Sequence, residues 1–187
     1  MQLDSASGWC HGVYHCPSPN FNARPAGEIS LLVIHNISLP PAQFKTGKVQ
    51  AFFQNRLDVT EHPYFEGIAD LRVSAHFLIE RDGELTQFVS CLDRAWHAGV
   101  SVFEGRETCN DFSIGIELEG TDEQPFTDAQ YTALIDLTRQ LQSAYPAICS
   151  ARICGHSDIA PGRKTDPGPF FDWSRFRAAL QLEVRDR

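Results

Sequence analysis

The sequence lacks the features that would mark a membrane protein or a nucleic-acid binder. No apolar run approaches the roughly 20 residues of a membrane-spanning helix, and the first residues show no basic segment followed by an apolar one. Positive charge is scarce, because 16 Lys and Arg face 24 Asp and Glu and leave a net charge of −8. Since polyanion binders rely on Lys and Arg at phosphates, we expect no nucleic-acid partner. The lack of a long apolar run and of an export signal predicts no membrane partner and a cytoplasmic location.

The sequence also lacks a CxxC pair, although it has six cysteines. Their spacings are irregular, and without an export signal a reducing compartment is expected. We therefore predict reduced and mostly buried thiols, because free cysteine is among the most buried residue types. The cysteines are Cys10, Cys16, Cys91, Cys109, Cys149 and Cys154.

The length of 187 residues suits a single domain, and residues 1–16 and 182–187 are expected to be peripheral. Apolar residues recur at helical spacing in some segments, whereas other segments are apolar throughout or alternate between apolar and polar residues. We expect helices at 49–57, 127–145 and 172–180, and strands at 29–35, 74–80, 84–89, 112–119 and 152–155. Interleaved strands and helices with one hairpin predict an α/β fold, a three-layer domain with a mixed β-sheet flanked by helices.

The segment GHSDIAPGRKTDPG, residues 155–168, gathers many polar groups. Its Gly and Pro residues argue against a regular helix or an interior strand and favour a loop of fixed shape. It carries His156 and Asp166, while His35 ends the predicted strand at 29–35. Two imidazoles and one carboxylate suit a zinc site with an open position for water, but an ion-paired structural turn explains these residues equally well.

The other histidines suit different roles. His11 and His15 lie four residues apart in a segment interrupted by glycine and proline, which favours a surface turn over a metal site. His62 precedes a proline and suits a capping or solvated position. His76 and His97 alternate with apolar neighbours, which is typical of residues that support a site or fill the core.

Five segments together resemble one known family: VIHN, SAHFLIERDGE, AWHAG, SIGIELEG and GHSDIAPGRKTDPG. In this order, from about residue 17 to 177, they resemble the zinc-dependent N-acetylmuramoyl-L-alanine amidases, and within them the AmpD-type 1,6-anhydro-N-acetylmuramyl-L-alanine amidases of cell-wall recycling. The resemblance implies the fold of peptidoglycan recognition proteins and phage amidases. It also implies one zinc ion per chain and hydrolysis of the amide between the lactyl group of anhydro-muramic acid and L-alanine in muropeptides.

The resemblance further implies roles for individual residues. The implied zinc ligands are His35, His156 and Asp166, the general base is Glu117, and the oxyanion partner is Lys164. Alternation along residues 112–119 independently places Glu117 on the polar face of its strand. Glu119 shares this face, but it could equally be a solvated residue at the end of the strand. Substrate contacts are expected from Asn36, Arg72, Trp96 and Arg163, although a surface salt bridge explains each arginine equally well.

Two other functions would use the same fold. A noncatalytic peptidoglycan-binding module is expected to lack a ligand or the base, whereas all of these residues are present here. A lytic amidase acting on polymeric peptidoglycan is expected to carry an export signal and a wall-binding domain. The sequence therefore favours an amidase of soluble anhydro-muropeptides over both alternatives.

Overall fold

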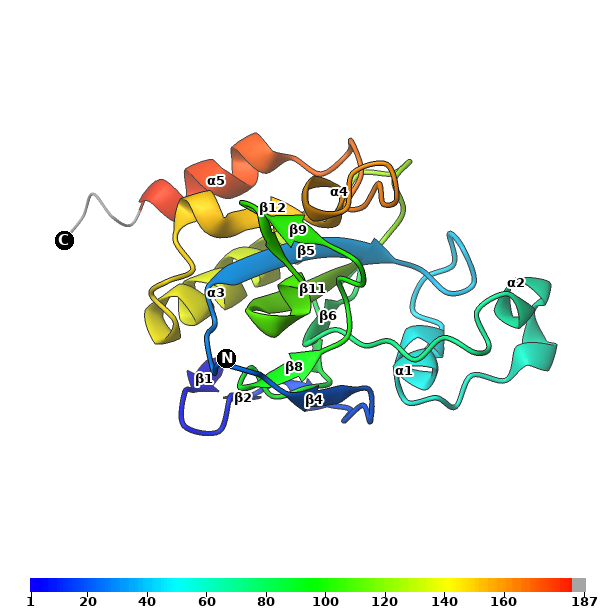
Figure 1. Ribbon diagram of the computed structural model, residues 1–187. Coiled ribbons are helices and arrows are strands. Elements are labelled where there is room, and N and C mark those ends of the chain that lie inside the picture. The colour runs from blue at the N-terminus through cyan, green and yellow to red at the C-terminus, as the bar shows by residue number, and fades with distance from the viewer. Residues whose placement is uncertain (183–187) are drawn as a thin grey trace.

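The computed structural model describes residues 1–182, so the prediction for 182–187 lies, apart from residue 182, outside the described residues (Figure 1). The strands are β1 Gln2–Asp4, β2 Trp9–His11, β3 Tyr14–His15, β4 Phe21–Ala23, β5 Leu31–Ile37, β6 Phe77–Ile79, β7 Leu85–Gln87, β8 Asp93–Ala95, β9 Val102–Phe103, β10 Arg106–Glu107, β11 Ser113–Glu119 and β12 Ile153–Gly155. The α-helices are α1 Lys48–Phe53, α2 Pro63–Glu66, α3 Asp128–Ala144, α4 His156–Ile159 and α5 Trp173–Leu182. Short 3₁₀ helices are η1 Val59–Glu61, η2 Cys109–Asp111 and η3 Ser150–Arg152.

A mixed six-stranded sheet in the order β12-β5-β11-β6-β7-β3 forms the centre of the described residues. Strands β12, β5, β11 and β6 are parallel, whereas β6 and β7 form the predicted antiparallel hairpin. The parallel strands are buried on both faces, which explains the nearly continuous apolar run of β5. The predicted mixed sheet with flanking helices is confirmed.

Alternation along β5 and β11 sends side chains to two different apolar clusters. Ile34 and Ile116 share a cluster with Leu134 and Leu137 of α3, and residues of α5 complete it. On the other face, Val33 belongs to a second cluster that includes residues of segment 98–112 and of α4. Because α3 and α5 occupy the first face, the second face is left for the polar ends of the strands.

The predicted starts of α3 and α5 are confirmed by their caps. Thr127 Oγ1 accepts a hydrogen bond from Gln130 N, and Gln130 Oε1 accepts one from Thr127 N, both at 3.1 Å. This capping box satisfies backbone donors that the first turn of α3 leaves free. Asp172 caps α5 through its side chain, because its Oδ1 atom accepts from Arg175 N at 2.9 Å.

Two predictions about local structure were wrong. Residues 156–159 form one turn of helix, α4, where no regular helix was expected, because Asp158 Oδ2 accepts from Gly155 N at 2.7 Å and Pro161 follows only after the turn is complete. Residues 1–16 are also more than a peripheral segment. Cys10 is fully buried in the main cluster, and β3 is the edge strand of the central sheet.

The predicted burial of the cysteines is confirmed for all but Cys149. All six are free in the described residues, and Cys149 is the exposed one among them. No helix in residues 1–182 has the length and apolar character needed to cross a membrane.

Candidate functional site

Three polar side chains meet where β5 and β12 end. Strand β12 pairs in parallel with β5 and aligns Gly155 with Ile34, so that His156 follows beside His35. The Nδ1 atoms of His35 and His156 are 3.0 Å apart, and each lies 3.1 Å from Oδ2 of Asp166. The two histidines are 1% and 3% exposed, so this group lies beneath the surface.

The loop at 155–168 brings Asp166 back to His156 through close backbone packing. A Cβ atom on Gly155 would lie 2.7 Å from Cδ of Pro167, so the approach requires glycine. Ser157 N donates to the carbonyl of Asp166 at 2.9 Å and closes the loop. The Gly and Pro content that marked this segment in the sequence thus fixes the third side chain of the group.

Burial and the mutual contacts set the charges of this group. Burial lowers the pKa of His35 to about 4, which leaves the imidazole neutral with a free lone pair. Burial alone would raise the pKa of Asp166, but hydrogen bonds with His156 and His35 outweigh it and the pKa is lowered. The group therefore offers imidazole nitrogens and an ionised carboxylate, the donor set of a divalent cation.

The geometry of the three atoms also fits a metal ion. Tetrahedral zinc with bonds of about 2.0–2.1 Å separates its ligand atoms by about 3.3 Å. The observed separations of 3.0 and 3.1 Å are close to that value. The Nε2 atom of each histidine already has a hydrogen-bond partner. His35 Nε2 bonds to His97, and His156 Nε2 bonds to the Ala98 carbonyl. Both Nδ1 atoms are thereby left for a cation.

Glu117 lies beside this group without belonging to it. Glu117 is on β11 and pairs in register with His35 on the neighbouring strand β5, so both side chains emerge on the same face. It is 8% exposed, and its Oε2 atom has no hydrogen-bond partner among the described residues. Burial and the Asp166 carboxylate raise the pKa of Glu117 well above its usual value, against the opposing effect of Lys164. A buried carboxylate with a raised pKa is suited to accept and release a proton during catalysis.

A cleft of about 690 Å³ opens over these residues. Most of the predicted substrate contacts line it, namely Asn36, Trp96 and Arg163, and so does the exposed Lys164. Arg72 lies outside this lining and donates instead to the carbonyls of Ala69 and Leu71. The structure thus brings Lys164 to the site and leaves Arg72 at the surface.

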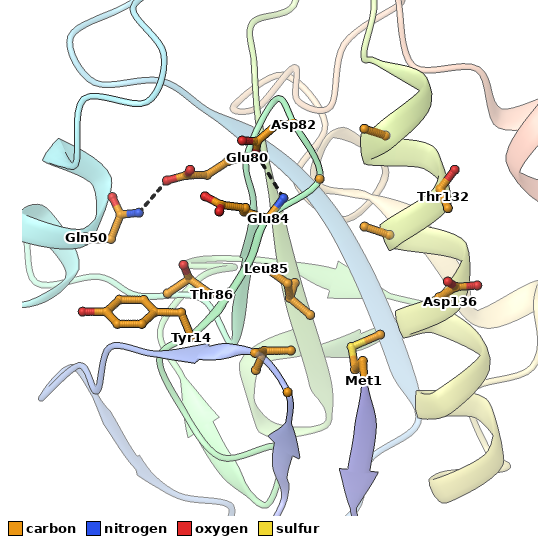
Figure 2. A pocket seen from close by; sticks show the side chains of 15 residues that line it. Met1, Tyr14, Gln50, Glu80, Asp82, Glu84, Leu85, Thr86, Thr132 and Asp136 are labelled. Carbon is orange, nitrogen blue, oxygen red and sulfur yellow. Dashed lines mark hydrogen bonds between the residues drawn. The ribbon is translucent and has the colours of Figure 1, made fainter.

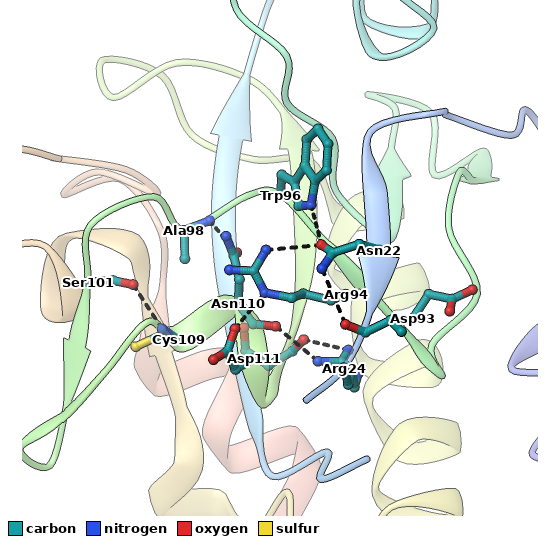
Figure 3. Close-up of polar contacts among 12 residues, drawn as sticks. Asn22, Arg24, Asp93, Arg94, Trp96, Ala98, Ser101, Cys109, Asn110 and Asp111 are labelled. Atoms are coloured by element: carbon teal, nitrogen blue, oxygen red, sulfur yellow. Dashed lines mark hydrogen bonds and ion pairs between the residues drawn. The ribbon is translucent and has the colours of Figure 1, made fainter. Parts of the chain in front are cut away.

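Partners that sequence reasoning missed fix the walls of the cleft. Asn36 Nδ2 donates to Asp122 at 2.6 Å. Trp96 Nε1 donates to Asn22 at 2.7 Å, a contact that Figure 3 shows. Arg163 donates to the carbonyls of Ala98 and Val100 at 2.6 and 2.7 Å, which ties the 155–168 loop to the neighbouring segment. The sequence carries no local signal for these pairs, because their members are far apart along the chain.

Glu119, on the same strand face as Glu117, has a structural role. It is 3% exposed, so the alternative of a solvated strand end was wrong. Its carboxylate accepts hydrogen bonds from the backbone nitrogens of Lys45 and Arg81. Glu119 therefore joins the segment before α1 to the β6–β7 hairpin.

A second cleft, of about 960 Å³, lies between the β6–β7 hairpin, α3 and the N-terminal strands (Figure 2). Three carboxylates, Glu80, Asp82 and Glu84, gather there, but Lys45 forms ion pairs with them. Its lining within the described residues holds no histidine. Although this cleft is larger, the groups suited to catalysis lie in the smaller one.

The chain is similar to known proteins over most of its length. Residues 25–169, which include every side chain of the site, match the family described as N-acetylmuramoyl-L-alanine amidase. The 1,6-anhydro-N-acetylmuramyl-L-alanine amidase AmpD of Haemophilus influenzae is 60% identical over 165 residues, covering 88% of this chain and 90% of that protein.

Solved structures show the same similarity. A crystal structure of a selenomethionine derivative of AmpD superposes with a TM-score of 0.93 at 56% identity, covering 96% of this chain and 99% of that chain. The amidase AmiD of Escherichia coli, solved in complex with the substrate anhydro-N-acetylmuramic acid-L-Ala-D-gamma-Glu-L-Lys, superposes with a TM-score of 0.60 at 29% identity. That match covers 91% of this chain and 60% of AmiD.

Proposed function

Because the chain belongs to the N-acetylmuramoyl-L-alanine amidase family, we propose that it hydrolyses the amide between the lactyl group of 1,6-anhydro-N-acetylmuramic acid and L-alanine in soluble muropeptides. One observation carries the proposal. A three-ligand set, formed by His35, His156 and Asp166, lies beside a buried carboxylate, Glu117, that has an oxygen free of hydrogen bonds among the described residues. The high identity to proteins named for this reaction supports the choice of substrate.

The proposed cofactor is one zinc ion, held by His35 and His156 through Nδ1 and by Asp166 through Oδ2. When bound, zinc supplies a Lewis acid that polarises the amide carbonyl and acidifies the attacking water. Glu117 takes a proton from that water on Oε2, the atom that has no hydrogen-bond partner among the described residues. The same carboxyl group then returns the proton to the amide nitrogen, so that L-alanine leaves as a neutral amine.

Lys164 supplies the positive charge that the transition state requires. The carbonyl oxygen becomes negative as water adds, and an ammonium group at the edge of the cleft stabilises this charge. Asn36 and Trp96 line the same cleft and are proposed to contact the sugar and the peptide stem. Arg163 is proposed to act mainly through the loop that it ties down, since backbone carbonyls already engage its guanidinium group.

The proposed site of action is the cytoplasm. Six free cysteines, most of them buried, suit a reducing compartment. A protein in that compartment meets muropeptides that have already been released from the wall, which agrees with a soluble substrate.

Elemental analysis combined with mass spectrometry of digests tests the proposal. The purified protein should carry about one zinc per chain and release intact stem peptide from an anhydro-muropeptide. Intact sacculi, tested in parallel, should yield far less free peptide. Full activity without metal would overturn the metal assignment, equal release from sacculi would indicate a lytic amidase, and binding without cleavage would indicate a noncatalytic module.

A further inference from the structure

Two consecutive residues, His97 and Ala98, contact the proposed histidine ligands at the ring nitrogens that do not face the proposed metal site. His35 Nε2 lies 2.9 Å from Nδ1 of His97, and His156 Nε2 lies 3.0 Å from the carbonyl oxygen of Ala98. A histidine that binds a metal through Nδ1 carries its proton on Nε2 and donates it. His97 Nδ1 and the Ala98 carbonyl are therefore the acceptors that fix the tautomer and the ring orientation of the two ligands.

The other side of the His97 ring shows that it is itself oriented. His97 Nε2 lies 3.1 Å from Oγ of Ser113 on β11. If His97 Nδ1 accepts from His35, the proton of the His97 ring is on Nε2 and is donated to Ser113. The hydrogen bonds thus run in one direction, from His35 through His97 to the sheet.

Gly115 provides the space that this ring occupies. A Cβ atom on Gly115 would lie 2.5 Å from Cγ and 2.6 Å from Nδ1 of His97, closer than side-chain atoms approach one another. Glycine within a strand marks such close approaches. The glycine in the middle of β11 is therefore explained by the ring of His97, which packs directly on the strand backbone.

Asn110 holds the backbone of the same two residues. Its Oδ1 atom accepts from the backbone nitrogens of His97 and Ala98, at 3.1 and 2.8 Å. The buried guanidinium group of Arg24 donates to the Asn110 carbonyl at 3.1 Å, and Figure 3 shows Asn110 between Ala98 and Arg24. The acceptors for both ligands are thus fixed by one buried network.

We propose that His97 and Ala98, packed on Gly115 and held by Asn110, orient His35 and His156 for the metal ion. The inference rests on the proposed zinc site. His97 is a positioning residue, because it acts through His35 and not on the substrate. Outer partners of this kind typically change metal affinity by about 10-fold to 100-fold when they are removed.

Two amide substitutions of His97 separate positioning from folding. In His97→Asn the side-chain oxygen replaces Nδ1, so the acceptor for His35 is kept, whereas in His97→Gln the amide reaches toward the Nε2 position and Ser113. Zinc affinity, measured by competition with a chromophoric chelator, should stay within about threefold of wild type for His97→Asn. For His97→Gln it should fall by about 10-fold to 100-fold, with a changed visible spectrum after Co²⁺ substitution.

Gly115→Ala tests the same inference without removing any polar group. The added methyl should displace the His97 ring and lower zinc affinity, while Gly67→Ala, at a glycine whose added Cβ would have no neighbour closer than 3.6 Å, should leave affinity unchanged. Melting of each metal-free variant is measured alongside. Equal zinc affinity in His97→Asn and His97→Gln, or equal losses of affinity and metal-free stability in both, would overturn the proposal. Failure of the wild-type protein to bind zinc would instead overturn the site itself.

Discussion

The pairing register of β11 with β5 places Glu117 beside the three proposed metal ligands, although Glu117 is not one of them. Its neighbour in the sheet is His35, yet its free oxygen remains without a partner among the described residues. Replacing this carboxylate should therefore change proton transfer and leave metal binding intact. The two functions can be separated by a substitution that preserves the shape of the side chain.

We predict that Glu117→Gln lowers kcat by about 10²-fold to 10⁴-fold, because the amide cannot accept the proton of the attacking water. Zinc content should stay near one per chain. Glu123→Gln is the matched control, since Glu123 is an exposed carboxylate that lines the same cleft, and its kcat should stay near wild type. Loss of zinc from Glu117→Gln would make Glu117 a ligand, and an unchanged kcat would remove it from the mechanism.

His76 gives a prediction about stability and pH. The ring is fully buried, and burial followed by the charge of Arg24 lowers the pKa of His76 to about 3, from 6.5 in the unfolded chain. Between these values the unfolded chain binds a proton that the folded protein does not. The free energy of unfolding is therefore predicted to fall as pH drops below 6.5, by up to about 2 kcal/mol from this residue between pH 6.5 and 5.0.

Urea unfolding at pH 7.5 and pH 5.0 measures this effect. His76 Nδ1 accepts a hydrogen bond from Gly115 N at 3.0 Å. His76→Asn should show a smaller loss of stability on acidification than wild type, because Asn does not titrate and its side-chain oxygen can replace Nδ1 as the acceptor. His11→Asn changes an exposed histidine and should leave the wild-type difference intact. An identical pH dependence in His76→Asn and wild type would show that the His76 ring is not kept neutral by the fold.

At the scale of elements, the caps of α3 connect the helix to the sheet that carries the site. Thr127 Oγ1 accepts from Gln130 N and also donates to the carbonyl of Arg81 at 2.6 Å. Gln130 Nε2 donates to the carbonyls of Ile79 and Glu119 at the ends of β6 and β11. The start of α3 is therefore bound to the same strand ends that approach the cleft.

We predict that Thr127→Ala lowers the free energy of unfolding by about 1–2 kcal/mol, because it removes an N-cap and a partly buried donor to the Arg81 carbonyl. Thr132→Ala makes the same chemical change at an exposed position of α3, where alanine suits the helix, and should be neutral. The kcat of both variants should equal that of wild type, since α3 packs on the face opposite the site. A stability loss of the same size in both variants would refute the capping role.

The elements that the sequence predicted are those with a strong local signal. The long helix and β11 have periodic apolar patterns, β5 has a continuous apolar run, and the Asp82-Gly83 pair marks the turn between β6 and β7. The pairs β1–β2 and β4–β8 have strands of three residues, too short to show a period, and only pairing within the fold defines them. Helix α4 was missed because one turn depends on a single cap, Asp158, and not on a pattern.

At the scale of the whole molecule, the site is assembled from segments that the sequence separates widely. His35 lies 121 residues from His156 and 131 from Asp166 along the chain. Residue types alone left a metal site and an ion-paired turn equally supported, and the family resemblance decided between them. Neither the residue types nor the family resemblance predicted the contact between Trp96 and Asn22, which lie 74 residues apart, because neither position carries a distinctive local pattern.

This separation would make a metal ion bound by the proposed ligands a cross-link, and we predict that removal of the metal destabilises the whole fold. A ligand that binds only the folded state adds about 4 kcal/mol at 1,000 times its Kd. For a chain of this length, that corresponds to a fall in Tm on the order of 10 °C when zinc is chelated.

Thermal melting with EDTA and after zinc is restored measures the effect, and the shift should be reversible. His156→Ala should melt at the same temperature with and without zinc, because it lacks one of the three ligands that join β5 to the 155–168 loop. His11→Ala removes an exposed histidine outside the group and should keep the full shift. If the chelated and zinc-loaded wild-type protein melt together, the three side chains do not cross-link the fold through a metal, and their contacts are those of an ion-paired turn.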